Sequence, residues 1–83
     1  MEGKDGNTLL HFAAAKPEQI QVLKKLIAER SDDINAQNKD GNTPLHVAFL
    51  RNNLEAVAAL LGAKPNVHII NNEGNTPFDL FKE

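Results

Sequence analysis

The chain of 83 residues contains no cysteine, no tryptophan and no tyrosine. Without cysteine it can form neither a disulfide nor a thiolate metal site, and such a composition is compatible with a reducing compartment. Residues 1–5 lack the basic start and the apolar stretch of a signal peptide. We therefore expect an intracellular, cytoplasmic protein.

An excess of one charge and long apolar runs are also missing. Nine basic and eleven acidic residues are interspersed along the chain and give a net charge of −2. Nucleic-acid binding usually needs a basic stripe that displaces counterions from phosphates, so we expect no nucleic-acid partner. The longest apolar run, residues 56–63, is far shorter than the roughly 20 residues that span a bilayer, so we expect no membrane partner.

The residue types that perform catalysis are few and isolated. Ser31 is the only serine, and it lies in a charged segment without the glycines of a nucleophile elbow. His11, His46 and His68 are too far apart in the sequence to show the short paired spacing of a zinc site. No glycine-rich phosphate loop is present. We therefore expect no enzyme activity, no cofactor and no metal.

One sequence pattern occurs three times. Gly-Asn-Thr opens residues 6–14 and 41–49, and it opens a degraded third copy at residues 74–81. The first residues of the three copies are 35 and then 33 residues apart. A fixed period of this length is typical of proteins built from stacked structural repeats.

Local chemistry predicts how each repeat begins. The turn glycine is followed two residues later by Thr8, Thr43 or Thr76, whose hydroxyl can cap the first turn of a helix. Pro44 and Pro77 come next, at the first helical position, where the missing N–H does no harm. A short helix is therefore expected after each threonine.

A longer helix is expected after each of the first two short ones. Residues at roughly 18–30 and 53–62 have apolar side chains at helical spacing along one face. The first repeat carries one extra residue near Pro17 and one near residues 30–32. Both insertions fall in predicted loops, where added length costs little.

The segment Thr43-Pro44-Leu45-His46-Val47-Ala48, with its period of about 33 residues, resembles the ankyrin repeat. The resemblance implies an all-α solenoid of stacked helix-turn-helix units, joined by β-hairpin-like turns. It implies a single domain over residues 1–83, with units at about 4–36 and 37–69 and a partial or capping unit at 70–83. It also implies that His11 and His46 are structural, because a ring nitrogen three residues after the threonine can complete the hydrogen bonds of the helix start.

The resemblance further implies a non-catalytic module that binds another protein through its turn tips and the exposed side of its first helices. The residues expected to contact the partner are Lys39, Asp40, Asn42, Leu50, Arg51, Asn72, Glu73 and Asn75. An alternative is a regulatory or targeting segment of a larger enzyme or effector. Self-association is also possible through apolar residues at the ends of the stack, namely Leu9, Leu10, Phe12, Phe78, Leu80 and Phe81.

Overall fold

Two helix pairs form the body of the protein. The computed structural model describes residues 5–29 and 31–81, and no strand occurs among them. The first pair is α1 (Leu9–Ala15) and α2 (Ile20–Glu29), and the second is α3 (Pro44–Leu50) and α4 (Leu54–Gly62). This is the all-α arrangement that the sequence predicts.

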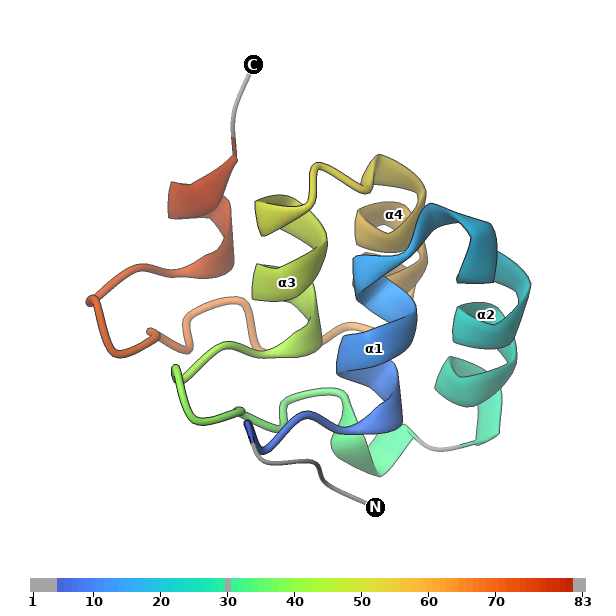
Figure 1. Cartoon of the computed structure of the whole chain (residues 1–83), viewed down its shortest axis with the longest axis horizontal. Coiled ribbons are helices and arrows are strands. Elements are labelled where there is room, and N and C mark those ends of the chain that lie inside the picture. Colours follow the sequence, from blue (N-terminus) through green and yellow to red (C-terminus); the bar gives the residue numbers. More distant parts are fainter. Residues whose placement is uncertain (1–4, 30, 82–83) are drawn as a thin grey trace.

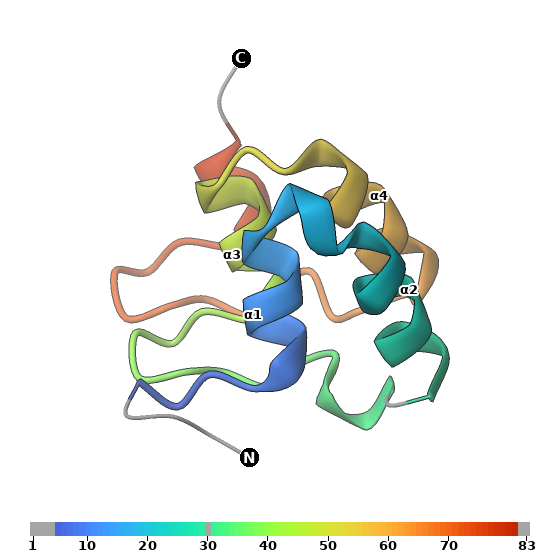
Figure 2. The ribbon, with the colours of Figure 1, turned by 45° about the vertical axis from the view of Figure 1, so that its right-hand side comes forward.

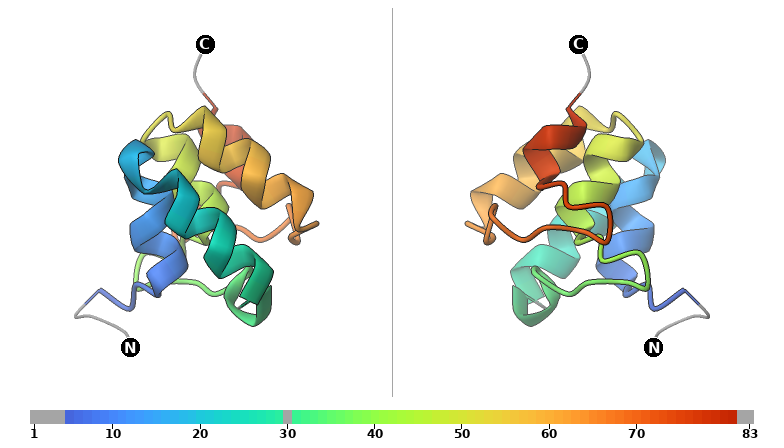
Figure 3. Two further views of the ribbon diagram at one scale, coloured as in Figure 1. Left: turned by 90° about the vertical axis from the view of Figure 1, so that its right-hand side faces the viewer. Right: turned by 90° about the vertical axis from the view of Figure 1, so that its left-hand side faces the viewer.

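The helices form two layers (Figure 1). α1 packs against α3, and α3 packs in turn against a 3-10 helix, η3 (Pro77–Leu80). α2 and α4 pack against each other and form the second layer, which the two views of Figure 3 show from opposite sides. The short first helices therefore lie side by side and share one exposed face.

Each helix of the first layer begins at a capping threonine. Thr8, Thr43 and Thr76 are the N-caps of α1, α3 and η3, and each hydroxyl accepts a hydrogen bond from the backbone N–H three residues later. Pro44 and Pro77 occupy the first turn, where proline's fixed φ suits a helix. The three helix starts are therefore set by the same local chemistry.

The insertions of the first repeat form 3-10 turns. α2 begins at Ile20 rather than near residue 18, because Pro17–Gln19 forms the 3-10 helix η1. The second insertion adjoins another 3-10 helix, η2 (Ser31–Asp33), while residue 30 lies outside the described part of the chain. The extra residues thus leave the helix pairs intact.

The helix pairs are connected by hairpin turns that project from the first layer and stack on one another (Figure 2). The N–H of Asn38 donates to the Asn42 carbonyl at 2.9 Å, and the N–H of Asn71 donates to the Asn75 carbonyl at 2.9 Å. Gly41 provides the positive φ, +79°, that the first of these turns requires.

The core lies between the two layers. Leu23 from α2 and Leu60 from α4 are completely buried there, together with Leu45 and Ala48 from α3. Leu10 was expected at an uncovered end of the stack, but this expectation was wrong, because Leu10 is buried in the same core. On α1 it points inward, towards the second layer, whereas Leu9 and Phe12 are about half exposed.

The third repeat differs from the other two. Its first helix, η3, is a 3-10 helix in which the N–H of Phe81 donates to the Phe78 carbonyl at 3.1 Å. Bonds from residue i to i−3 satisfy the backbone over a few residues, so a short piece favours this tighter winding. Leu80 is half-buried against the core, and the Phe78 and Phe81 rings flank Phe49 at centroid distances of 5.5 and 5.9 Å.

Candidate protein-binding groove

The two buried histidines connect neighbouring repeats. In the second repeat, His46 Nδ1 accepts from the Thr43 N–H at 3.0 Å and lies 2.8 Å from Thr43 Oγ1. Its Nε2 lies 2.9 Å from the carbonyl oxygen of Asn75, in the next hairpin. A carbonyl can only accept, so Nε2 carries the proton and donates. One imidazole therefore closes its own helix start and holds the following repeat.

His11 has the same geometry one repeat earlier. Its Nδ1 lies 2.9 Å from Thr8 Oγ1 and 3.0 Å from Thr8 N, and its Nε2 donates to the Asn42 carbonyl at 2.7 Å. Both rings are almost inaccessible to solvent. Burial also lowers the pKa of His46, and the hydrogen bond to the Asn75 carbonyl opposes this shift only in part. The lowered pKa favours the neutral imidazole, and only the neutral ring can accept a hydrogen bond at Nδ1.

In the third repeat, Asp79 stands where the other repeats have histidine. Asp79 Oδ2 accepts from the Thr76 N–H at 2.9 Å, and the Asp79 N–H donates to Thr76 Oγ1 at 3.3 Å. The carboxylate thus reproduces the half of the network that lies within the repeat. A carboxylate has no proton to donate to a further carbonyl, so the half that joins repeats is not reproduced.

Several asparagines, whose role sequence reasoning missed, complete this scaffold. Asn38 Oδ1 accepts from the N–H groups of Asp40 and Asn42, both at 3.0 Å, and so supports the second hairpin. Asn71 does the same in the third. Asn53 is buried between the helix pairs and donates to the Ala14 carbonyl at 3.0 Å. Asn38 and Asn71 both stand three residues before a turn glycine, a regularity that could have identified them.

Neighbouring hairpins are also bonded directly to each other. The N–H of Lys39 donates to the Asp5 carbonyl at 2.8 Å, and the N–H of Asn72 donates to the Asp40 carbonyl at 2.9 Å. Within the described residues, every buried side-chain nitrogen or oxygen has a hydrogen-bond partner. Hydrogen bonds within the protein therefore hold the neighbouring hairpins together.

A groove of about 350 Å³ runs along the exposed face of the first layer, between the hairpins and the far ends of α1 and α3. Four residues that the sequence predicts as contacts line it: Asp40, Leu50 and Arg51, which are exposed, and Asn42, which is buried. Their counterparts from the first repeat, including Asp5 and Lys16, line it too. Asp5 and Lys16 are exposed as well. The structure thus brings the turn tips and the helix ends to one surface.

The other predicted contact residues lie in different places. Asn72 and Glu73 are exposed and line a neighbouring hollow of about 290 Å³, which Asp40 shares. Lys39 is exposed at its turn but is not among the residues that line the groove. Asn75 is half-buried and supplies its carbonyl to His46.

Asn42 was expected at an exposed turn tip, but it is only 8% exposed. Its Oδ1 accepts from Asn71 Nδ2 at 3.0 Å, and its carbonyl accepts from His11. Because its side-chain oxygen and its carbonyl are used inside the protein, we treat Asn42 as a supporting residue rather than an exposed contact.

Two further findings concern other kinds of site. Among the described residues, no group of three or more His, Cys, Asp or Glu side chains could hold a metal ion. In the same part of the chain, no helix is long and apolar enough to cross a membrane.

Comparison with known proteins identifies the repeats. Residues 10–80 match the family model described as ankyrin repeats (3 copies). The chain is 40% identical over 80 residues to protein phosphatase 1 regulatory subunit 12A from Mus musculus, an alignment that covers 96% of this chain and 8% of that protein. It is 34% identical over 79 residues to NF-kappa-B inhibitor alpha from Homo sapiens, covering 93% of this chain and 25% of that protein.

Rabankyrin-5 from Mus musculus is 37% identical over 81 residues, covering 93% of this chain and 6% of that protein. The chain therefore spans a quarter or less of the length of these curated relatives. Repeats of this family are protein-interaction modules, and the matching segments of these relatives extend over nearly all of the chain described above. The chain belongs to the ankyrin-repeat family.

Proposed function

We propose that this chain is a non-catalytic module that binds another protein in the groove between its hairpins and its first helices. The observation that carries this proposal is the contrast between buried and exposed residues of the groove. The buried residues His11 and Asn42 are hydrogen-bonded within the protein, whereas the side chain of Leu50, which also lines the groove, is 49% exposed. An ordered surface that presents an apolar side chain loses little conformational entropy on binding.

Matched double variants test this proposal. A protein binder is first selected against the parent chain, and its affinity is then measured for Leu50→Asn/Arg51→Glu and for Val22→Asn/Lys25→Glu. Val22 and Lys25 are exposed on α2, in the other layer, and Val22 is exposed to nearly the same fraction as Leu50. Only the groove variant should lose affinity, by about tenfold or more. Equal affinities for the two variants would contradict the proposal.

The alternative of a regulatory segment within a larger protein has its own support. Two of the relatives are named as a regulatory subunit and as an inhibitor, and both are far longer than this chain. We propose that the same groove would then act inside a longer polypeptide. Expression of the chain with and without its natural flanking sequence would distinguish this arrangement from an independent module.

Self-association through the ends of the stack is a further proposal. Leu9 and Phe12 at one end, and Phe78 and Phe81 at the other, are each about half exposed. Thermal unfolding over a hundred-fold range of protein concentration tests it, because association of folded chains would raise the melting temperature with concentration. A constant melting temperature would exclude the proposal for the isolated chain.

Two further features remain proposals. We place the repeat boundaries at about 36/37 and 69/70, which lie in the extended segments before the second and third hairpins. We also propose an intracellular, cytoplasmic location, on the grounds that a cysteine-free chain suits a reducing compartment. Imaging of the tagged protein in its native cell would test the location.

A further inference from the structure

The two edges of the groove carry opposite charges. Asp5, in the turn before α1, and Asp40, in the hairpin before α3, line one edge. Lys16 and Arg51 line the other edge and are the C-cap residues of the same two helices. The seven residues of each helix separate the edges by about 10 Å, at 1.5 Å per residue. Each full repeat therefore contributes one acidic and one basic side chain.

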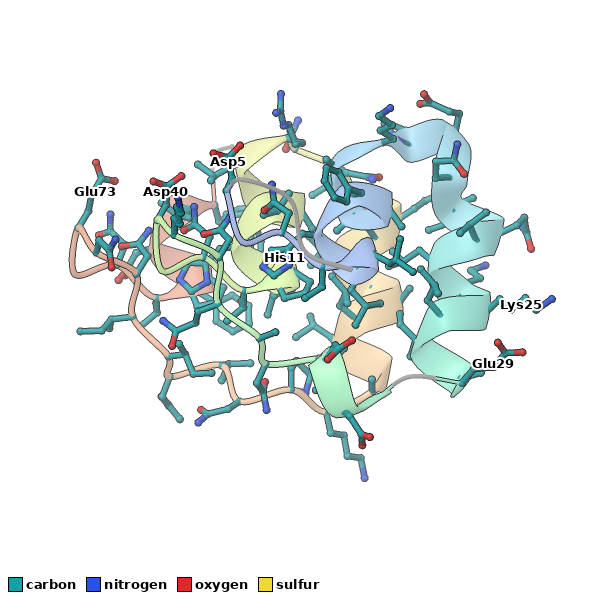
Figure 4. All side chains as sticks on the ribbon, turned by 60° about the horizontal axis from the view of Figure 1, so that its bottom comes forward. Asp5, His11, Lys25, Glu29, Asp40 and Glu73 are labelled. Carbon is teal, nitrogen blue, oxygen red and sulfur yellow. The ribbon has the colours of Figure 1, made fainter. Side chains whose placement is uncertain are left out.

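The acidic edge continues into the third repeat. Glu73 and Asp40 line the adjoining hollow together. Figure 4 shows Asp5, Asp40 and Glu73 on successive turns, on the opposite side of the molecule from Lys25 and Glu29. The three carboxylates thus form a row with one member in each repeat.

The second and third hairpins do not need the carboxylates of Asp40 and Glu73 for their own turns. The turn bonds are made by the Asn38 and Asn71 side chains, which accept from the backbone N–H groups of Asp40 and Glu73. No hydrogen bond or ion pair joins the carboxylate of Asp5, Asp40 or Glu73 to any other residue of the described ranges. Their charge is therefore available to a partner.

The basic edge is available in the same way. A positive side chain at a helix C-terminus is favoured by the helix dipole, which accounts for the sign of the charge at Lys16 and Arg51. It does not account for their position along one groove, where both are exposed and neither is ion-paired within the described residues. Between the two edges lie the apolar side chains of Phe12, Ala15, Val47 and Leu50.

We propose that the groove takes a protein segment with an apolar strip between a basic edge, which faces the hairpins, and an acidic edge, which faces the ends of α1 and α3. This inference rests on the proposed function and adds the chemistry of the partner to it. Complementary charges fix the orientation of the segment and increase its association rate. A nucleic acid does not fit, because its phosphates would meet the row of carboxylates.

The test uses a library of random peptides displayed on phage and selected on the intact chain. Peptides selected by the parent should carry basic and acidic side chains on either side of an apolar strip. The variant Asp5→Lys/Asp40→Lys/Glu73→Lys should instead select peptides in which the basic edge is replaced by an acidic one. These substitutions fall on exposed side chains whose carboxylates make no hydrogen bond or ion pair within the described residues, so we expect the fold to be retained, which circular dichroism will verify.

Affinity measurements on one selected peptide make the test quantitative. Neutralising the row, as Asp5→Asn/Asp40→Asn/Glu73→Gln, should weaken binding about tenfold at low salt, since three exposed charge pairs each contribute modestly. The difference should shrink at about 0.5 M salt, where exposed charges are screened. The control Glu18→Gln/Glu29→Gln/Glu55→Gln changes the net charge equally on exposed residues outside the groove and should leave affinity unchanged.

The outcomes separate this inference from the proposed function. Peptides that require Leu50 but bind the neutralised and parent proteins equally would overturn the charge pattern and leave the binding groove in place. A selection without binders, or with binders indifferent to Leu50→Asn, would overturn both. Replacing the basic side chains of the peptide by acidic ones should weaken its affinity for the unaltered protein to a similar degree. An unchanged affinity would also overturn the charge pattern.

Discussion

Replacement of Gly41 by alanine should destabilise the protein much more than the same replacement at Gly74. Both glycines lie at equivalent positions of successive hairpins, and their φ angles, +79° and +82°, are nearly equal. Their surroundings differ. A Cβ on Gly41 would lie 2.7 Å from the backbone nitrogen and 2.7 Å from Oδ1 of Asn72, whereas a Cβ on Gly74 would meet nothing within 4 Å.

The expected costs follow from this difference. At Gly74 only the left-handed backbone penalises alanine, at about 1–2 kcal/mol. At Gly41 the same penalty applies, and the third hairpin must also move away from the new methyl group, which costs about 1–3 kcal/mol more. The movement would weaken the 2.9 Å bond from the Asn72 N–H to the Asp40 carbonyl, worth about 1 kcal/mol. Gly41→Ala should therefore cost about 2–4 kcal/mol more than Gly74→Ala.

Urea denaturation followed by circular dichroism measures both costs. With a slope of about 1 kcal/mol per molar urea for a small domain, the Gly74→Ala midpoint should fall by about 1–2 M. The Gly41→Ala midpoint should fall at least about 2 M further, and the variant could be unfolded without urea if the parent is only marginally stable. Equal midpoints for the two variants would refute the close stacking of the second and third hairpins.

Three further predictions concern the helix caps, the core and the buried histidine. Thr43→Ala should cost about 1 kcal/mol in a thermal melt, because α3 loses its cap, while Thr43→Ser should retain most of it. Leu60→Ala should cost about 2–5 kcal/mol as a truncation in the core, and Leu61→Ala, at a half-buried position, should cost less. The lowered pKa of His46 means that the unfolded chain binds its proton more readily, so stability should be complete above pH 6.5 and fall as the pH drops below it. His46→Gln should flatten that dependence between about pH 7.5 and 5.5.

The helix pairs could be predicted from the sequence because their signals are local. A capping threonine, a proline at the first helical position and an apolar face at helical spacing each act within a few residues. The repeated period then indicates that the pairs stack, since one unit cannot bury its apolar face alone. The family and the all-α fold are accordingly confirmed, and the bounds of α4 differ from the expected 53–62 by one residue.

The hairpin network could not be predicted because its partners are distant in the sequence. Asn53 reads as a loop residue, yet its amide bonds the Ala14 carbonyl, 39 residues earlier. Asn42 reads as a turn tip, yet it is enclosed because the next hairpin stacks over it and Asn71 bonds its side chain. The neighbouring hairpin decides whether a polar turn residue is buried and bonded within the protein or exposed on its surface. The sequence of a single repeat does not contain that information.

The same network gives the stack a direction. His11 and His46 each donate forward to the following hairpin, whereas Asp79 at the equivalent position has no proton to donate. A further repeat placed against η3 would therefore meet a carboxylate instead of an imidazole N–H. Its attachment would depend on apolar contact with Phe78 and Phe81, whose rings are about half exposed around a pocket of about 430 Å³. The series of hydrogen bonds from each repeat to the next hairpin therefore ends at Asp79. Replacement of Asp79 by histidine would restore the missing donor.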